Sequence, residues 1–190
     1  MNKKYFGVKE IAITAALLAI CVISQLFKNL SIFITGPIVN VCIIMAVLAG
    51  NLPCAIILSI ITPATAYIIA ASPVMTTVPA IIPFIMMGNI VLAVSTALLL
   101  KKSLSGEGGL KSPLNYIKAV ICAVLKGAFM GLTISLWLLP TFIPAESKLY
   151  SKLPVFQMTF SLYQAITAAI GFVYAFIVWA ALSKVIKREM

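Results

Sequence analysis

The chain has 190 residues, of which 63% are hydrophobic and only 9% are charged, and its formal net charge is +10. Because soluble domains carry about 25% charged residues, this composition excludes an ordinary soluble fold and indicates a membrane protein. The basic residues lie between the apolar runs and form no single patch, which excludes a nucleic-acid-binding domain. The sequence has no histidine and no aspartate, so it lacks most of the groups on which catalysis and proton coupling inside a membrane depend.

Six apolar segments follow one another along the chain, and we expect each to form a helix across the hydrocarbon core, which takes roughly 20 residues. A tight turn is expected at 50–53, and Pro63 is expected to kink the third helix. The segments 101–115 and 140–154 are expected to be polar loops. We predict one all-α integral membrane domain over 1–190, a compact bundle of six transmembrane helices with spans at about 8–27, 37–50, 54–71, 79–100, 116–139 and 155–182, the second starting as early as Ile32.

The basic residues sort to alternate ends of the predicted spans. Lys28, Lys148 and Lys152 lie at one end, and Lys126 falls inside the fifth span. Because Lys and Arg accumulate in cytoplasmic loops, the more basic end predicts that both termini are cytoplasmic. The basic residues at that end are Lys3, Lys4, Lys9, Lys101, Lys102, Lys111, Lys118, Lys184, Lys187 and Arg188.

Lys126 is the main candidate for a functional side chain. It lies about ten residues into the fifth span, on the order of 15 Å from the cytoplasmic end of that helix. A lysine at this depth needs an anion, and no span offers a carboxylate deep inside it. One interpretation is that the carboxylate or phosphate of a substrate supplies the anion. The other is that the long side chain extends back to the cytoplasmic interface.

Further polar residues fall at a similar depth and predict a pocket that opens toward the outer face. In the fifth and sixth spans, residues at helical spacing form one stripe each, and the second and fourth spans each contain an asparagine. Apolar walls with a few polar groups are typical of small-molecule sites, although an interhelical seam would show the same pattern. The predicted substrate-binding residues are Lys126, Met130, Thr133, Trp137, Ser161, Gln164, Asn89 and Asn40, and the sixth-span stripe also contains Gln157 and Ala168.

Small residues mark a different face. Ala12, Ala15, Ala16 and Ala19 line the cytoplasmic half of the first span, and small residues four apart let helices approach closely. This face is expected either to pack within the bundle or to dock another membrane protein. Gly127 and Gly131 form a Gly-x-x-x-Gly pair, for which we expect internal packing.

Motifs for other chemistries are missing from the sequence. The four cysteines fall in separate apolar runs without a Cys-x-x-Cys pair, so we expect small buried residues rather than a metal site. The chain contains no P-loop, no Gly-x-Ser-x-Gly and no His-Glu-x-x-His motif. We therefore expect no cofactor, no metal site and no enzymatic activity, with any ATP hydrolysis supplied by partners.

In its length, span number, orientation and first-helix alanines, the chain resembles the substrate-binding S components of energy-coupling factor (ECF) vitamin transporters. Ala12-Ile-Thr-Ala-Ala16 and Ala15-Ala-Leu-Leu-Ala19 match the pattern with which that family docks on its coupling protein. The segments 35–40, 79–84, 88–89 and 125–126 also look like segments of some S components. The resemblance implies capture of a vitamin or related micronutrient near the outer face of a bacterial cytoplasmic membrane. It also implies partnership with a transmembrane coupling protein and two cytoplasmic ATPases.

Two other functions remain open from the sequence. A stand-alone secondary transporter or channel would need its own ion coupling or pore, and it would transport its substrate in liposomes without ATP. An integral membrane enzyme would usually rely on aspartate, histidine or a metal cluster. The substrate itself is not specified by the sequence.

Overall fold

The computed structural model describes residues 7–27, 31–105 and 109–186, and all regular elements among them are helical. Six helices of this part of the chain are long and apolar enough to cross a membrane. The protein is therefore an all-α membrane bundle, as the sequence predicts. The spans are α1 (Val8–Leu26), α2 (Ile32–Ala49), α3 (Leu52–Ala70), Ile81–Leu104, Pro113–Phe142 and Tyr150–Ser183.

The last three spans are composite. The fourth contains α5 (Ile81–Thr96), a π-helical turn and α6 (Lys102–Ser105), whereas the fifth runs from α7 (Pro113–Met130) through a π-helical segment, Gly131–Leu138, into α8 (Leu139–Phe142). The sixth is divided into α9 (Leu153–Phe160) and α10 (Leu162–Ile186). Ser161 separates these two helices with φ −118° and ψ −88°, which is outside the helical region.

Local sequence explains where several helices begin. The side-chain oxygen of Ser31 accepts a hydrogen bond from the Phe33 N–H at 3.1 Å, so α2 starts before Pro37 rather than at it. Asn51 caps α3 in the same way, accepting from the Cys54 N–H at 3.0 Å, and Pro53 occupies the first turn. Lys101 Nζ donates to the Gly50 carbonyl at 2.9 Å, which satisfies the C-terminal end of α2.

Two predicted linkers contain ordered structure. The connection between the third and fourth spans includes a short helix, α4 (Pro73–Thr77), with Val74 and Met75 buried. The predicted loop 101–115 begins with helix, and its last residue, Asn115, is buried and donates to the Gly109 carbonyl at 2.5 Å. These interactions satisfy polar groups locally, which polar composition alone does not reveal.

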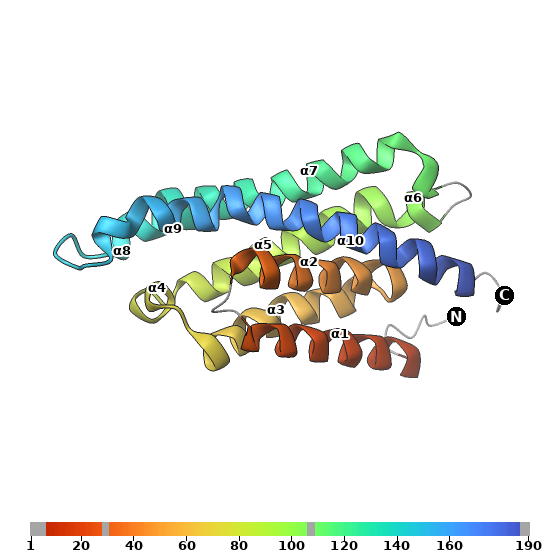
Figure 1. Cartoon of the computed structure of the whole chain (residues 1–190), viewed down its shortest axis with the longest axis horizontal. Coiled ribbons are helices and arrows are strands. Elements are labelled where there is room, and N and C mark those ends of the chain that lie inside the picture. Colours follow the sequence, from red (N-terminus) through yellow and green to blue (C-terminus); the bar gives the residue numbers. More distant parts are fainter. Residues whose placement is uncertain (1–6, 28–30, 106–108, 187–190) are drawn as a thin grey trace.

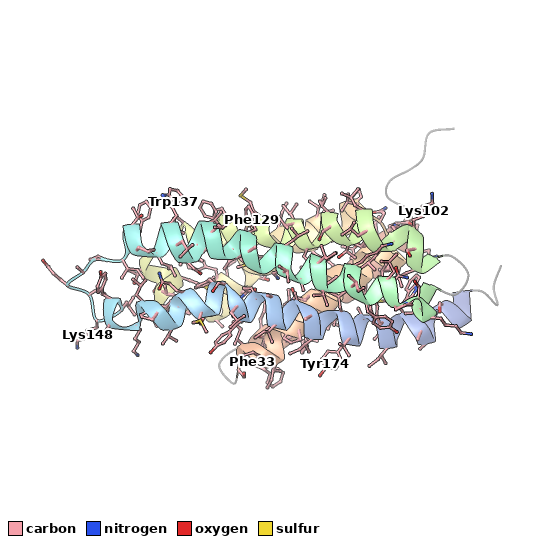
Figure 2. All side chains as sticks on the ribbon, turned by 90° about the horizontal axis from the view of Figure 1, so that it is seen from above. Phe33, Lys102, Phe129, Trp137, Lys148 and Tyr174 are labelled. Carbon is pink, nitrogen blue, oxygen red and sulfur yellow. The ribbon has the colours of Figure 1, made fainter. Side chains whose placement is uncertain are left out.

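The central helix of the bundle is α2, which packs against α1, α3, α5 and α10, whereas α7 packs against α5 and α10. Helix α1 packs mainly against α2 and α3, so it lies at the periphery of the bundle. In Figure 1 the start of α1 and the end of α10 lie at one end of the bundle, and α4, α8 and α9 lie at the other. Lys102 and Lys148 mark these two ends in Figure 2.

Candidate functional site: a cavity around buried Lys126

Lys126 lies on the buried face of α7 with only 3% of its surface exposed. Its ammonium donates to Asn40 Oδ1 of α2 at 2.6 Å and to Asn89 Oδ1 of α5 at 2.8 Å. The structure thus brings together three predicted site residues from separate spans. Lys126 therefore bonds within the bundle, and its side chain does not extend to the protein surface.

Asn40 extends this contact into a polar chain that ends on α10. Its Nδ2 donates to Thr167 Oγ1 at 3.4 Å, and the Thr167 hydroxyl donates to the Gln164 carbonyl at 3.2 Å. Asn40 is 1% exposed and Thr167 is fully buried. Because each acceptor is matched to a donor, the side-chain oxygen of Asn40 is oriented toward Lys126.

Glycines allow the helices to meet closely around these residues. A Cβ added to Gly171 would lie 2.7 Å from the Cβ of Asn40, and one added to Gly88 would lie 2.5 Å from the Cγ of Met130. A Cβ at Gly127, the residue after Lys126, would lie 2.6 Å from the Cβ of Ala165. At distances this short a side chain fits only if its neighbours shift, so the glycines allow α2, α5, α7 and α10 to approach one another closely around Lys126.

Lys126 lines a cavity of about 330 Å³, a size at the low end of small-molecule sites. Its polar lining comes from α1, α2, α3, α5 and α7, from the segment around α4, and from α9 and α10. Apolar side chains such as Val39, Ile85 and Phe160 form much of the wall. The polar lining residues are Gln25, Thr35, Asn40, Thr62, Ser72, Asn89, Lys126, Thr159 and Gln164.

Gln25 is a buried contributor to this cavity, with 2% of its surface exposed. Its Nε2 donates to the Thr62 carbonyl at 2.9 Å, whereas its Oε1 is buried without a hydrogen-bond partner. From the sequence, Gln25 and Asn29 lie near the outer end of the first span and belong to the amides whose shared depth predicts an outward-facing polar pocket, although neither is among the predicted substrate-binding residues. The structure places Gln25 in the same cavity as Lys126. Asn29, its neighbour in that region, lies outside the described residues.

The predicted fifth-span stripe divides at the π-helical segment. Met130 is fully buried against Gly88, but it does not line the cavity. Thr133 donates to the Phe129 carbonyl at 2.7 Å, and Trp137 is 54% exposed, with its ring edge against Phe84. Figure 2 shows Trp137 pointing outward. The prediction that these four residues share one inward face is therefore wrong, because i→i+5 bonding shifts every residue after Gly131 relative to a regular α-helix.

The predicted sixth-span stripe is likewise divided. Gln164 lines the cavity and donates to the Thr159 carbonyl at 3.3 Å, whereas Ser161 bonds to the Gln157 carbonyl at 2.5 Å at the break between α9 and α10. Gln157 exchanges two hydrogen bonds with Ser135, at 3.0 Å and 2.8 Å. Gln157 therefore joins the fifth and sixth spans, Ser161 bonds within the sixth span, and neither residue lines the cavity.

The first-helix alanines lie away from this cavity. Ala12, Ala15, Ala16 and Ala19 are all exposed, which leaves their face of α1 uncovered within the chain. Ala16 also lines a groove of about 610 Å³ between α1, α2 and α10, whose walls are apolar apart from Lys9, Cys42 and Tyr174.

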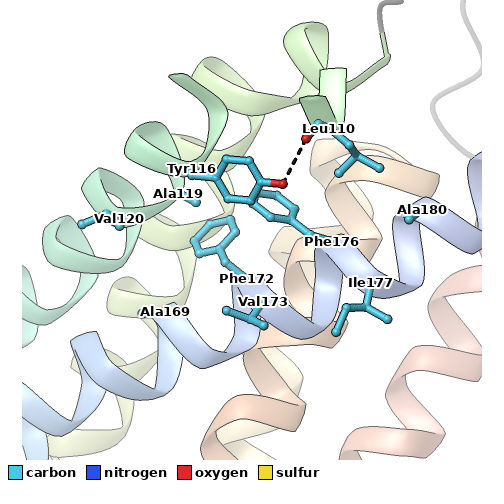
Figure 3. Close-up of a pocket in the computed structure, with 10 residues that line it drawn as sticks. All are labelled: Leu110, Tyr116, Ala119, Val120, Ala169, Phe172, Val173, Phe176, Ile177 and Ala180. Atoms are coloured by element: carbon cyan, nitrogen blue, oxygen red, sulfur yellow. Dashed lines mark hydrogen bonds between the residues drawn. The ribbon is translucent and has the colours of Figure 1, made fainter. Parts of the chain in front are cut away.

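A third cavity, of about 440 Å³, lies between α7 and α10 and is lined by aliphatic and aromatic side chains (Figure 3). Tyr116 is its polar lining residue, and the Tyr116 hydroxyl donates to the Leu110 carbonyl at 3.0 Å. With its one hydroxyl already bonded, this cavity offers little for recognising a polar ligand. The cavity around Lys126 is the better candidate site.

Comparisons of the chain with family models, curated proteins and solved structures gave no match. Within the described residues, no group of three or more histidine, cysteine or acidic side chains converges on a site that a metal could occupy. Cys21, Cys42, Cys54 and Cys122 are free and buried.

Proposed function

We propose that the protein is a small-molecule-binding membrane subunit of the ECF S-component type, which captures a vitamin or related micronutrient and delivers it to the cytoplasm with partner subunits. One observation carries the proposal: a buried lysine, held by two neutral amides, lines a cavity in the membrane bundle. Burying a lysine without a counter-ion costs folding free energy, and binding of an anionic ligand would offset this cost.

The position of the cavity supports an outward-facing site. Its polar lining includes Gln25 near the end of α1, Thr35 near the start of α2 and residues beside α4 and α9. These elements lie toward the end of the bundle opposite the start of α1 and the end of α10 (Figure 1). With cytoplasmic termini in a bacterial cytoplasmic membrane, this end is the outer one.

The exposed alanines on α1 support a partner. A helix at the edge of a bundle, with small residues uncovered on one face, can accept a second membrane helix at close range. We assign this face to the transmembrane coupling protein, which in turn joins two cytoplasmic ATPases. The chain itself then needs neither a nucleotide site nor ion coupling.

Affinity purification from the native membrane tests this assignment. The wild-type chain and the variants Ala16→Leu and Ala19→Leu are purified in mild detergent, and copurifying proteins are identified by mass spectrometry. A coupling protein and ATPases are expected with the wild type and are expected to be lost with both variants. Ala128→Leu is the matched control, because Ala128 is also an exposed alanine but lies on α7.

Transport by the chain alone would contradict the proposal. If liposomes that hold only this protein accumulate its copurified small molecule without ATP, the chain is a stand-alone transporter or channel. Retention of the ATPases by the Ala16→Leu and Ala19→Leu variants would remove the docking role of α1.

A further inference from the structure

The charge of Lys126 is not neutralised by the surrounding protein. Its two hydrogen-bond partners, Asn40 and Asn89, are neutral amides, and among the described residues it has no other hydrogen-bond partner and no ion pair. Of the described acids, Glu10 bonds to the Gly7 N–H and Glu146 is exposed in the segment after α8. An ammonium has three donors, so one donor remains for a ligand, and the charge of the protonated amine has no counter-ion among the described residues.

This arrangement fits a ligand with a single negative charge. Among the residues that the structure describes, Lys126 is the one charged residue that lines the cavity. A phosphate ester carries about −1.5 to −2 charges and three strong acceptor oxygens, which one lysine with two occupied donors cannot match. A carboxylate carries one charge and can accept the remaining N–H.

A second buried group in the same cavity requires the opposite chemistry. The Thr62 carbonyl can only accept, so it fixes the amide nitrogen of Gln25 toward itself and leaves Oε1 as the unsatisfied atom. Oε1 is buried without a partner, although Gln25 lines the cavity. A ligand hydroxyl or N–H group that reached Oε1 from the cavity would supply the donor that this buried acceptor lacks.

We infer that the ligand is a small monocarboxylate with an apolar body and at least one hydroxyl or N–H donor, its carboxylate at Lys126 and its donor at Gln25. The apolar part of the cavity wall, which includes Val39 and Ile85, fits the body of the ligand, and the volume of about 330 Å³ limits its size. The inference rests on the proposed function only in taking this cavity as the ligand site.

The test is affinity selection by mass spectrometry on the purified full-length protein in detergent. The probe is an equimolar library of small hydroxy- and amido-monocarboxylates, each present with its primary amide and with its O- or N-methyl derivative. We expect the acids to be retained about tenfold or more over their amides, because a hydrogen bond to a charged group is lost. We also expect them to be retained over the methylated acids, which cannot donate to Gln25.

Two variants assign these preferences to the two residues. Asn89→Asp places a carboxylate 2.8 Å from Lys126 and keeps a buried partner for it, so the fold is expected to survive while the acid preference falls about tenfold. Gln25→Leu is expected to abolish the discrimination between donor and methylated acids while keeping the preference for acid over amide. Far-UV circular dichroism checks that each variant is folded.

Retention of the neutral amides in place of the monocarboxylates would overturn the inference, as would no retention at all. An unchanged acid preference in Asn89→Asp would also overturn it. The proposed function fails by a different result, the absence of ATPase partners from the native membrane. Selective acid binding without those partners would therefore keep the ligand class and reject the transport role.

Discussion

Replacing Gly127 with alanine is expected to destabilise the bundle at the level of Lys126. The added Cβ would meet the Ala165 Cβ at 2.6 Å, and it would also meet the backbone nitrogen of Ala165 and the carbonyl of Ser161 at 3.1 Å each. Carbon atoms in contact lie about 3.5 Å apart or more, so the two helices must separate by about 0.9 Å. Overpacking of this kind costs about 1–3 kcal/mol, and backbone atoms cannot move aside as a flexible side chain can.

Gly131→Ala is the matched control, four residues further along the same span. There the new Cβ would meet the Ser161 Cβ at 3.1 Å, with the next contact at 3.8 Å. The required shift is only about 0.4 Å by the same criterion. Alanine also favours the helix over glycine by roughly 0.5–1 kcal/mol, and this term is similar in both variants, so the difference between them reports the contact.

The assay is unfolding of the two variants in mixed micelles of a nonionic detergent and sodium dodecyl sulfate, followed by far-UV circular dichroism. We expect the free energy of unfolding of Gly127→Ala to lie about 1–3 kcal/mol below that of Gly131→Ala. Equal free energies of unfolding would refute the reasoning, because they would mean that α7 and α10 do not lie so close at Gly127 that an added Cβ forces them apart.

Other substitutions test the shifted helix face, the amide chain and the orientation. Met130→Ala should lower the free energy of unfolding by about 2–5 kcal/mol, because Met130 is fully buried. Trp137→Ala should lower it clearly less, because the Trp137 side chain is 54% exposed. A larger loss for Trp137→Ala than for Met130→Ala would argue against the π-helical segment. Asn40→Leu should lower the free energy of unfolding by about 1–3 kcal/mol, because it removes a hydrogen-bond partner of Lys126. Asn40→Asp keeps such a partner and should restore the stability. Equal losses in the two variants would show that packing alone matters at this position. Lys148→Cys should react with an impermeant maleimide on intact cells, and Lys102→Cys should react only after permeabilisation. Both lysines are exposed and lie at opposite ends of the bundle, and the native cysteines are buried. The reverse labelling pattern would mean that the termini are outside.

Much of the fold follows from hydropathy. The six apolar runs became six helices because backbone polar groups within a membrane must bond internally. A related rule for polar side chains explains why Lys126, Asn40 and Asn89 could all be predicted from the sequence as residues of one site. Each interrupts an apolar run, and polar side chains at such depth face the bundle interior and pair with one another.

The rest depended on geometry that the sequence pattern does not carry. The prediction for Trp137 assumed 3.6 residues per turn through a segment that is π-helical, so the predicted face of this residue was wrong. Ser161 breaks the sixth span without a proline or glycine, and a regular stripe was drawn through it. Gln25 reaches the cavity through a bond to the Thr62 carbonyl, and main-chain partners of this kind have no signature in the sequence.

The amide partners of Lys126 connect the stability of the protein to the ligand selectivity proposed above. A carboxylate in place of Asn40 or Asn89 would neutralise the ammonium within the protein and would stabilise the empty bundle, but it would leave no charge for a ligand. Two amide oxygens instead hold the ammonium in position at 2.6 and 2.8 Å and satisfy its donors only in part. The protein can therefore fold without a ligand. An anion that bound at Lys126 would add the charge–charge interaction that the two amides do not provide. For the binding subunit proposed above, the affinity for an anionic ligand would come from a charge that the fold leaves uncompensated.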